Sequence, residues 1–165
     1  MKNWSKEKFS SIYPTFIFFF LSLVIFSGCS ASKKSASKNV EEVIQTARSY
    51  RGTPYRYGGT TRAGMDCSAL IYQSFASIGI QMPRTSEGQS KLGKNVAEKN
   101  LQKGDLVFFA TSKSRKKVTH SGIVTEVSGK GIYFIHSSTS LGVTEDNLSS
   151  TYWNKAFLFG KRILD

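Results

Sequence analysis

Apolar residues in the first half of the domain recur every three or four positions, which is the spacing of one face of an α-helix. A first predicted helix begins at the N-cap Asn39 and ends before Gly52. A second predicted helix has Asp66 as its N-cap and ends before Gly79, so Cys67 takes the first helical position. The apolar face of the first helix holds Val43, Ile44, Ala47 and Tyr50.

Beyond residue 100 the pattern changes to short segments that are rich in β-branched and aromatic residues, which is typical of strands. The predicted strands are 105–110, 121–127, 131–137 and 156–163. Gly129 and Lys130 form the predicted tip of a hairpin between the middle two strands. Because helices come first and an antiparallel sheet follows, the order predicts an α+β domain with the N-terminal helices packed on the sheet.

The N-terminus has the features of an export signal. Lys2, Lys6 and Lys8 precede an uncharged apolar run over residues 15–27. A run of this length fits the roughly 7–15 residues of a signal peptide better than the roughly 20 of a membrane-spanning helix. It ends in Phe26-Ser27-Gly28-Cys29, which resembles the lipobox at which bacterial lipoproteins are cleaved and acylated.

This pattern predicts a lipoprotein signal peptide over residues 1–28 and a lipid on Cys29. Residues 29–38 lack apolar periodicity and are predicted to be a flexible tether, followed by a single folded domain over 39–165. The expected location is the bacterial cell envelope, lipid-anchored to a membrane and facing the periplasm or the cell exterior. The alternative is an uncleaved anchor in which Cys29 is incidental.

The chain has only two cysteines, and lipidation of Cys29 leaves Cys67 without a disulfide partner. An unpaired cysteine in an exported protein is a candidate reactive thiol, although a buried, inert cysteine is the alternative. The net charge of +12 favours an anionic partner. No basic helix or aromatic-interleaved motif indicates nucleic acid, so we expect envelope polymers or lipid headgroups as counter-charge.

The only two histidines, His120 and His136, lie on the two strands of the predicted hairpin. The antiparallel pairing makes them candidate cross-strand neighbours on one face. A thiol becomes a strong nucleophile when a helix N-terminus or an imidazolium favours its anion. The arrangement predicts a triad in which Cys67 attacks, His120 exchanges the proton and His136 orients His120. The same trio offers three zinc ligands, but no CxxC or HxxxH pair supports a metal site, so none is expected.

Six segments, in this order, together resemble the NlpC/P60 cysteine peptidases, and among them the Spr-type lipoprotein murein endopeptidases. The resemblance covers roughly residues 40–165 and extends to Gly142-Val143 and Tyr152-Trp153. The six segments are Gly52-Thr53-Pro54-Tyr55-Arg56-Tyr57-Gly58-Gly59, Gly64-Met65-Asp66-Cys67-Ser68-Ala69-Leu70, Met82-Pro83-Arg84-Thr85-Ser86, Gly104-Asp105-Leu106-Val107-Phe108-Phe109, His120-Ser121-Gly122-Ile123-Val124 and Phe134-Ile135-His136-Ser137-Ser138.

The resemblance implies a papain-like α+β fold. It also implies that Cys67 is the nucleophile, His120 the general base and His136 the third polar residue. Tyr55 matches a tyrosine that lines the active site, where its hydroxyl would bind the oxyanion, or it is a packing aromatic. The remaining candidates for the substrate and oxyanion site are Ser68, Arg84 and Ser86.

The function implied is hydrolysis of peptidoglycan stem peptides through a Cys67 acyl-enzyme, by a monomer without a cofactor. The bond is either the D-alanyl–diaminopimelate crosslink or the γ-D-glutamyl–diaminopimelate bond. A catalytically inactive, peptidoglycan-binding lipoprotein is one alternative. An acyltransferase or amidase on the same scaffold is another.

Overall fold

The computed structural model describes residues 28–112 and 117–164, and Ala36 begins the compact unit that holds the sheet. The helices, including the short 3₁₀ helix η1, are α2 (Gly28–Ser49), α3 (Cys67–Ala76), α4 (Ser86–Gln89), η1 (Glu98–Asn100) and α5 (Thr151–Ala156). The strands are β1 (Thr60–Thr61), β2 (Gly64–Met65), β3 (Lys94–Val96), β4 (Leu106–Phe109), β5 (His120–Ser128), β6 (Gly131–Ser138), β7 (Gly142–Asn147) and β8 (Phe157–Arg162).

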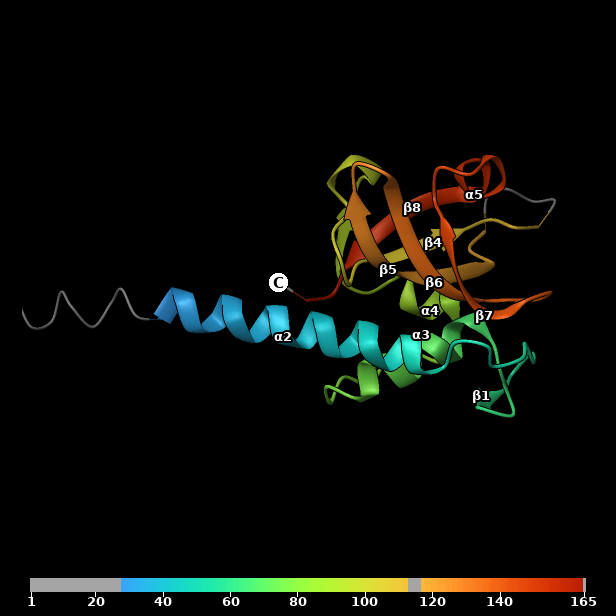
Figure 1. Cartoon of the computed structure of the whole chain (residues 1–165), viewed down its shortest axis with the longest axis horizontal. Helices are drawn as coiled ribbons and strands as arrows, with labels where there is room; N and C mark the ends of the chain where they lie inside the picture. Colours follow the sequence, from blue (N-terminus) through green and yellow to red (C-terminus); the bar gives the residue numbers. More distant parts are fainter. Residues whose placement is uncertain (1–27, 113–116, 165) are drawn as a thin grey trace, which may run out of the picture. The chain divides into compact units, whose positions relative to one another are not determined.

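The main sheet has six antiparallel strands in the order β3-β8-β4-β5-β6-β7, so β4 to β7 form a meander (Figure 1). The four predicted strands correspond to β4, β5, β6 and β8. Ser128 pairs with Gly131, which confirms the two-residue hairpin turn at Gly129 and Lys130. Strands β3 and β7 were not predicted, because each is short or rich in polar residues. The predicted α+β class is confirmed.

Because side chains alternate along the strands, the sheet has two apolar faces, and different helices pack on each. One face contributes Leu106, Phe108, Ile123 and Ile135 to a core shared with α2 and α3. The other contributes Val107, Phe109, Val124 and Phe134, which pack with Trp153 and Ala156 of α5. Helix α3 lies against β5 and β6, as Figure 1 shows. Strands β5 and β6 are thus packed between α3 and α5.

Helix α2 differs from its predicted extent. It begins at Gly28 rather than at Asn39, so the predicted N-cap is wrong. Residues 29–38, predicted to be a flexible tether, are helical in the structure. Residues 30–38 are all Ser, Ala, Lys, with neither Gly nor Pro to stop a helix from extending N-terminally. The division into signal peptide, tether and domain stays a prediction.

The predicted export signal is mostly outside the structure. The apolar run over residues 15–27 lies outside the described residues, and Cys29 falls in the first turn of α2. Within residues 28–112 and 117–164, no helix has both the length and the apolar character needed to cross a bilayer.

A buried ion pair joins β8 to the residue that precedes β4. Arg162 donates from Nε to Asp105 Oδ1 and from Nη2 to Oδ2, both at 2.8 Å, and the Asp105 side chain is 2% exposed. Removing one member of such a pair leaves a buried charge unsatisfied. We expect Arg162→Ala to lower the free energy of unfolding by about 3 kcal/mol, measured by urea denaturation. The matched control is Lys155→Ala at an exposed position, and an equal, small loss in both variants would refute the prediction.

Candidate active site

Cys67 stands at the first position of α3, as predicted. The side chain of Asp66 caps the helix by accepting a hydrogen bond of 2.8 Å from Ala69 N–H. Cys67 is 7% exposed, and its thiol takes part in no disulfide. The helix N-terminus concentrates backbone N–H groups and positive potential beside the sulfur, which favours an anion there.

Arg84 holds the capping residue in place. Its guanidinium donates to both carboxylate oxygens of Asp66 at 2.9 and 2.8 Å, to Ser68 Oγ at 2.8 Å and to Gly59 O at 3.2 Å. Burial alone would raise the pKa of Asp66, but the hydrogen bonds from Arg84 and from backbone N–H groups lower it below its usual value. The terminal nitrogens of Arg84 are therefore engaged in fixing the start of α3, which leaves them less available for the substrate contact predicted from the sequence.

A cavity of about 510 Å³ opens beside the sulfur. Its lining includes every site residue predicted on the helical side of the domain, namely Tyr55, Cys67, Ser68, Arg84 and Ser86. Burial, followed by the proximity of Cys67, raises the pKa of Tyr55, so its hydroxyl keeps its proton and is a hydrogen-bond donor at neutral pH. Among the described residues no group of histidine, cysteine and carboxylate side chains is arranged to hold a metal ion.

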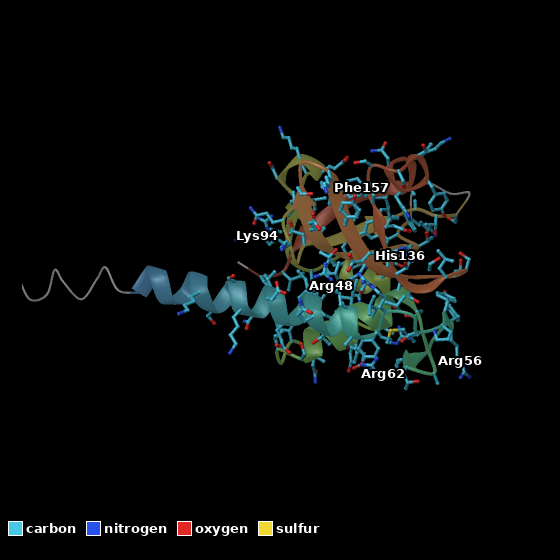
Figure 2. The ribbon with its side chains drawn as sticks, viewed as in Figure 1. Arg48, Arg56, Arg62, Lys94, His136 and Phe157 are labelled. Atoms are coloured by element: carbon cyan, nitrogen blue, oxygen red, sulfur yellow. The ribbon has the colours of Figure 1, made fainter. Side chains whose placement is uncertain are left out.

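The two histidines form a buried pair. His120 Nε2 lies 2.9 Å from His136 Nδ1, and His136 Nε2 lies 3.0 Å from Asp146 Oδ2. The three residues come from β5, β6 and β7, and Figure 2 labels His136 on the sheet. Val124 pairs with Phe134 and Ile123 with Ile135, and in this register the two histidines are diagonal neighbours on one face rather than directly opposite. The predicted proximity of His120 and His136 is confirmed.

Trp153 of α5 covers both imidazoles. Its ring stacks on His120 with centroids 5.4 Å apart and meets His136 edge-on at 4.8 Å. Burial lowers the pKa of His120 to about 4 and also lowers that of His136, which the neighbouring imidazole lowers further. Both rings are therefore neutral near pH 7 and able to accept a proton.

Asp146 was missed from the sequence because β7 was not recognised as a strand. Its Oδ2 accepts hydrogen bonds from His136 and, at 2.7 Å, from Trp153 Nε1–H. The segment Gly142–Asn147 alternates poorly in hydrophobicity, so nothing along the sequence marked Asp146 as a neighbour of His136. Trp153 was noted only as part of the family resemblance.

The sulfur and the imidazoles are brought to the same region but do not bond to each other. Cys67 Sγ lies 3.4 Å from Ser86 Oγ, whereas His120 lines a second cavity, of about 280 Å³. The residue that follows each histidine nevertheless forms a hydrogen bond to a residue close to Cys67. Ser121 Oγ lies 2.8 Å from Ser86 Oγ, and Ser137 Oγ donates to Met65 O at 2.8 Å.

The model of the NlpC/P60 family matches residues 52–162, which is more than half of the chain. The chain belongs to the NlpC/P60 family. The family resemblance seen in the sequence is thereby confirmed, and the cysteine at the start of α3 and both histidines lie inside the matched NlpC/P60 segment.

Two curated NlpC/P60-type relatives come from Escherichia coli. The probable endopeptidase NlpC is 38% identical over 117 residues, a match that covers 70% of this chain and 73% of the relative. The murein DD-endopeptidase MepS/murein LD-carboxypeptidase is 34% identical over 121 residues, covering 70% of this chain and 58% of the relative. A crystal structure of an NlpC/P60 family protein from Bacillus cereus superposes with a TM-score of 0.69 at 32% identity, covering 76% of this chain and 40% of that one.

Proposed function

We propose that this chain is a cysteine peptidase that hydrolyses peptide bonds in the stem peptides of peptidoglycan. The observation that carries the proposal is the free thiol at the start of α3, which lines a cavity in an NlpC/P60 domain whose sheet holds a pair of neutral, buried imidazoles. The relatives from Escherichia coli bear the names endopeptidase and murein endopeptidase, which supports the same class of reaction.

In the proposed mechanism His120 takes the proton of Cys67, and the sulfur attacks the carbonyl carbon of the scissile bond. His120 then protonates the leaving nitrogen, the carbon–nitrogen bond breaks, and a thioester remains on Cys67. Water, deprotonated by His120, attacks the thioester carbonyl, and the sulfur leaves as a thiol. His136 orients His120 throughout, and no metal or cofactor takes part.

The proposed mechanism assigns two groups to bind the negative oxygen of the tetrahedral intermediate. One is the backbone N–H of Cys67 at the helix start, and the other is the hydroxyl of Tyr55, which lines the same cavity. Ser86 contacts the sulfur in the resting enzyme. Because catalytic hydrogen bonds often shorten only when substrate binds, we propose that the sulfur exchanges Ser86 for His120 at that stage.

Lipid anchoring belongs to the same proposal. A lipid on Cys29, after removal of residues 1–28, would hold the domain at a membrane of the cell envelope, within reach of the wall. The expected state is a monomer whose partners are stem peptides and the membrane. Acyl labelling with a radioactive fatty acid, lost in Cys29→Ala, tests this part alone.

The purified protein is expected to release soluble muropeptides from isolated sacculi. Mass spectrometry of the products identifies the bond, because cleavage at the D-alanyl–diaminopimelate crosslink gives separated stems, whereas cleavage at γ-D-glutamyl–diaminopimelate shortens single stems. Retention of the protein on sacculi without release of any product would favour the inactive, peptidoglycan-binding alternative. Products that carry a new acyl acceptor would favour an acyltransferase. Release of ammonia from an amidated side chain would favour an amidase.

A further inference from the structure

A row of hydrogen bonds continues past the second imidazole of the proposed triad. It leads from His120 Nε2 to His136 Nδ1, then from His136 Nε2 to Asp146 Oδ2, with distances of 2.9 and 3.0 Å. Trp153 Nε1–H donates to the same carboxylate oxygen at 2.7 Å. The proposed roles of Cys67, His120 and His136 do not use Asp146 or Trp153.

The chemistry of the row determines where each proton lies. An ionised carboxylate only accepts hydrogen bonds, so His136 must carry its proton on Nε2. A neutral imidazole has one N–H, which makes His136 Nδ1 an acceptor and requires the proton of His120 to be on Nε2. The lone pair of His120 is then on Nδ1, the ring nitrogen that is not engaged with His136.

We propose that Asp146 is a positioning residue that fixes the tautomers of both histidines, so that His120 presents an unprotonated Nδ1 as the base for Cys67. The inference rests on the proposed role of His120, but it concerns proton positions that exist without substrate. Without the carboxylate, the reverse arrangement becomes available, with His136 Nδ1–H donating to His120 Nε2. The proton of His120 would then be on Nδ1, and the base would be blocked.

Trp153 determines which atom faces His136 when the carboxylate is replaced by an amide. Because Oδ2 accepts from both Trp153 and His136, an asparagine can satisfy both donors only by placing its carbonyl oxygen there. Its amide group at that position would meet the indole N–H donor to donor. Trp153 is therefore the second positioning residue, and it also stacks on His120.

The electrostatic surroundings of the pair are simple. The titratable groups that act on the two imidazoles are Asp146, on both rings, and His120, on His136. Asp146 raises the pKa of both histidines, against the larger lowering by burial. Removing its charge is expected to lower the pKa of both rings further, which moves any acid limb governed by them to lower pH.

The test uses the purified protein and reads the tautomers directly from the ring ¹⁵N shifts in two-bond ¹H–¹⁵N spectra at pH 7. The wild type is expected to carry the proton on Nε2 of both histidines. Asp146→Asn should keep this pattern, because Trp153 holds the amide oxygen in place. The double variant Asp146→Asn/Trp153→Phe should move both protons to Nδ1, and Trp153→Phe alone should resemble the wild type.

The reactivity of Cys67 towards iodoacetamide gives a second readout that needs no substrate. Asp146→Asn is expected to lower the rate by about 10-fold and the double variant by about 100-fold, by analogy with the range found for groups that orient metal-bound histidines. The acid limb of the alkylation rate should move to lower pH in Asp146→Asn. A merely structural role of Asp146 would leave that limb in place. Glu126→Gln removes an exposed carboxylate from the same sheet and is expected to change neither readout.

A proton on Nδ1 of His120 in the wild type would overturn the proposal, as would unchanged tautomers and reactivity in the double variant. The switched pattern already in Asp146→Asn would overturn the part assigned to Trp153. If the protein shows the expected tautomers but releases no muropeptides, the result counts against the peptidase function and not against this inference.

Discussion

Alanine in place of Cys67 is expected to reduce the release of muropeptides from sacculi by a factor on the order of 10³ or more, because the variant has no nucleophile to form the thioester. The loss should appear in kcat, since the cavity beside the sulfur keeps its other walls. Release is measured as soluble product by chromatography with mass detection. The thiol touches Ser86 and makes no other side-chain hydrogen bond among the described residues, so the fold should survive.

Two controls separate chemistry from folding and anchoring. Cys67→Ala should unfold thermally within a few degrees of the wild type, which shows that the sheet and α3 are intact. Cys29→Ala removes the other cysteine of the chain and should retain the activity of the detergent-solubilised protein. Wild-type rates in Cys67→Ala would eliminate the nucleophile assignment, whatever the state of the fold.

The elements predicted well from the sequence are those in which local pattern and burial agree. β4 is buried at all four positions and reads as an uninterrupted apolar run, so its assignment needed no tertiary information. β7 has two buried positions, and its polar residues Thr144 to Asn147 pair with β6 through backbone bonds that no side-chain pattern reveals. The predicted start of α2 was wrong for a different reason. Asn39 is a good N-cap, but the residues before it are also compatible with a helix.

The residues of the candidate site likewise divide into those that local sequence signals predict and those that only the tertiary structure reveals. Cys67 and the two histidines were predicted because a helix cap and a hairpin turn are local signals that fix where each side chain begins. The role of Arg84 was not predictable, because its bonds with Asp66 and Ser68 depend on how the loop before α4 folds back over α3. Asp146 and Trp153 reach the imidazoles from two elements that the sequence did not predict. Residues that orient a catalytic group through tertiary contacts carry no spacing of their own.

The acid limb of kcat/KM is expected near pH 4 rather than near 6.5. The base must be neutral to accept the Cys67 proton, so activity is present above the pKa of His120 and is lost as the pH falls through it. An exposed imidazole would place that loss near pH 6.5. Burial under Trp153 disfavours the imidazolium and lowers the pKa of His120 to about 4. The enzyme should therefore retain its activity down to about pH 5, where an enzyme with an exposed imidazole as its base has lost most of it.

Stem peptides carry carboxyl groups that also titrate near pH 4, so the hydrolysis profile needs a companion measurement without substrate. Alkylation of Cys67 by iodoacetamide depends on the same base and should show the same acid limb. His120→Gln, which removes the base and keeps a polar side chain, should slow alkylation and abolish the limb. A limb near pH 6.5 in the alkylation of the wild type would mean that water reaches the imidazoles, and it would rule out a dry, neutral histidine pair as the origin of the reactivity of Cys67.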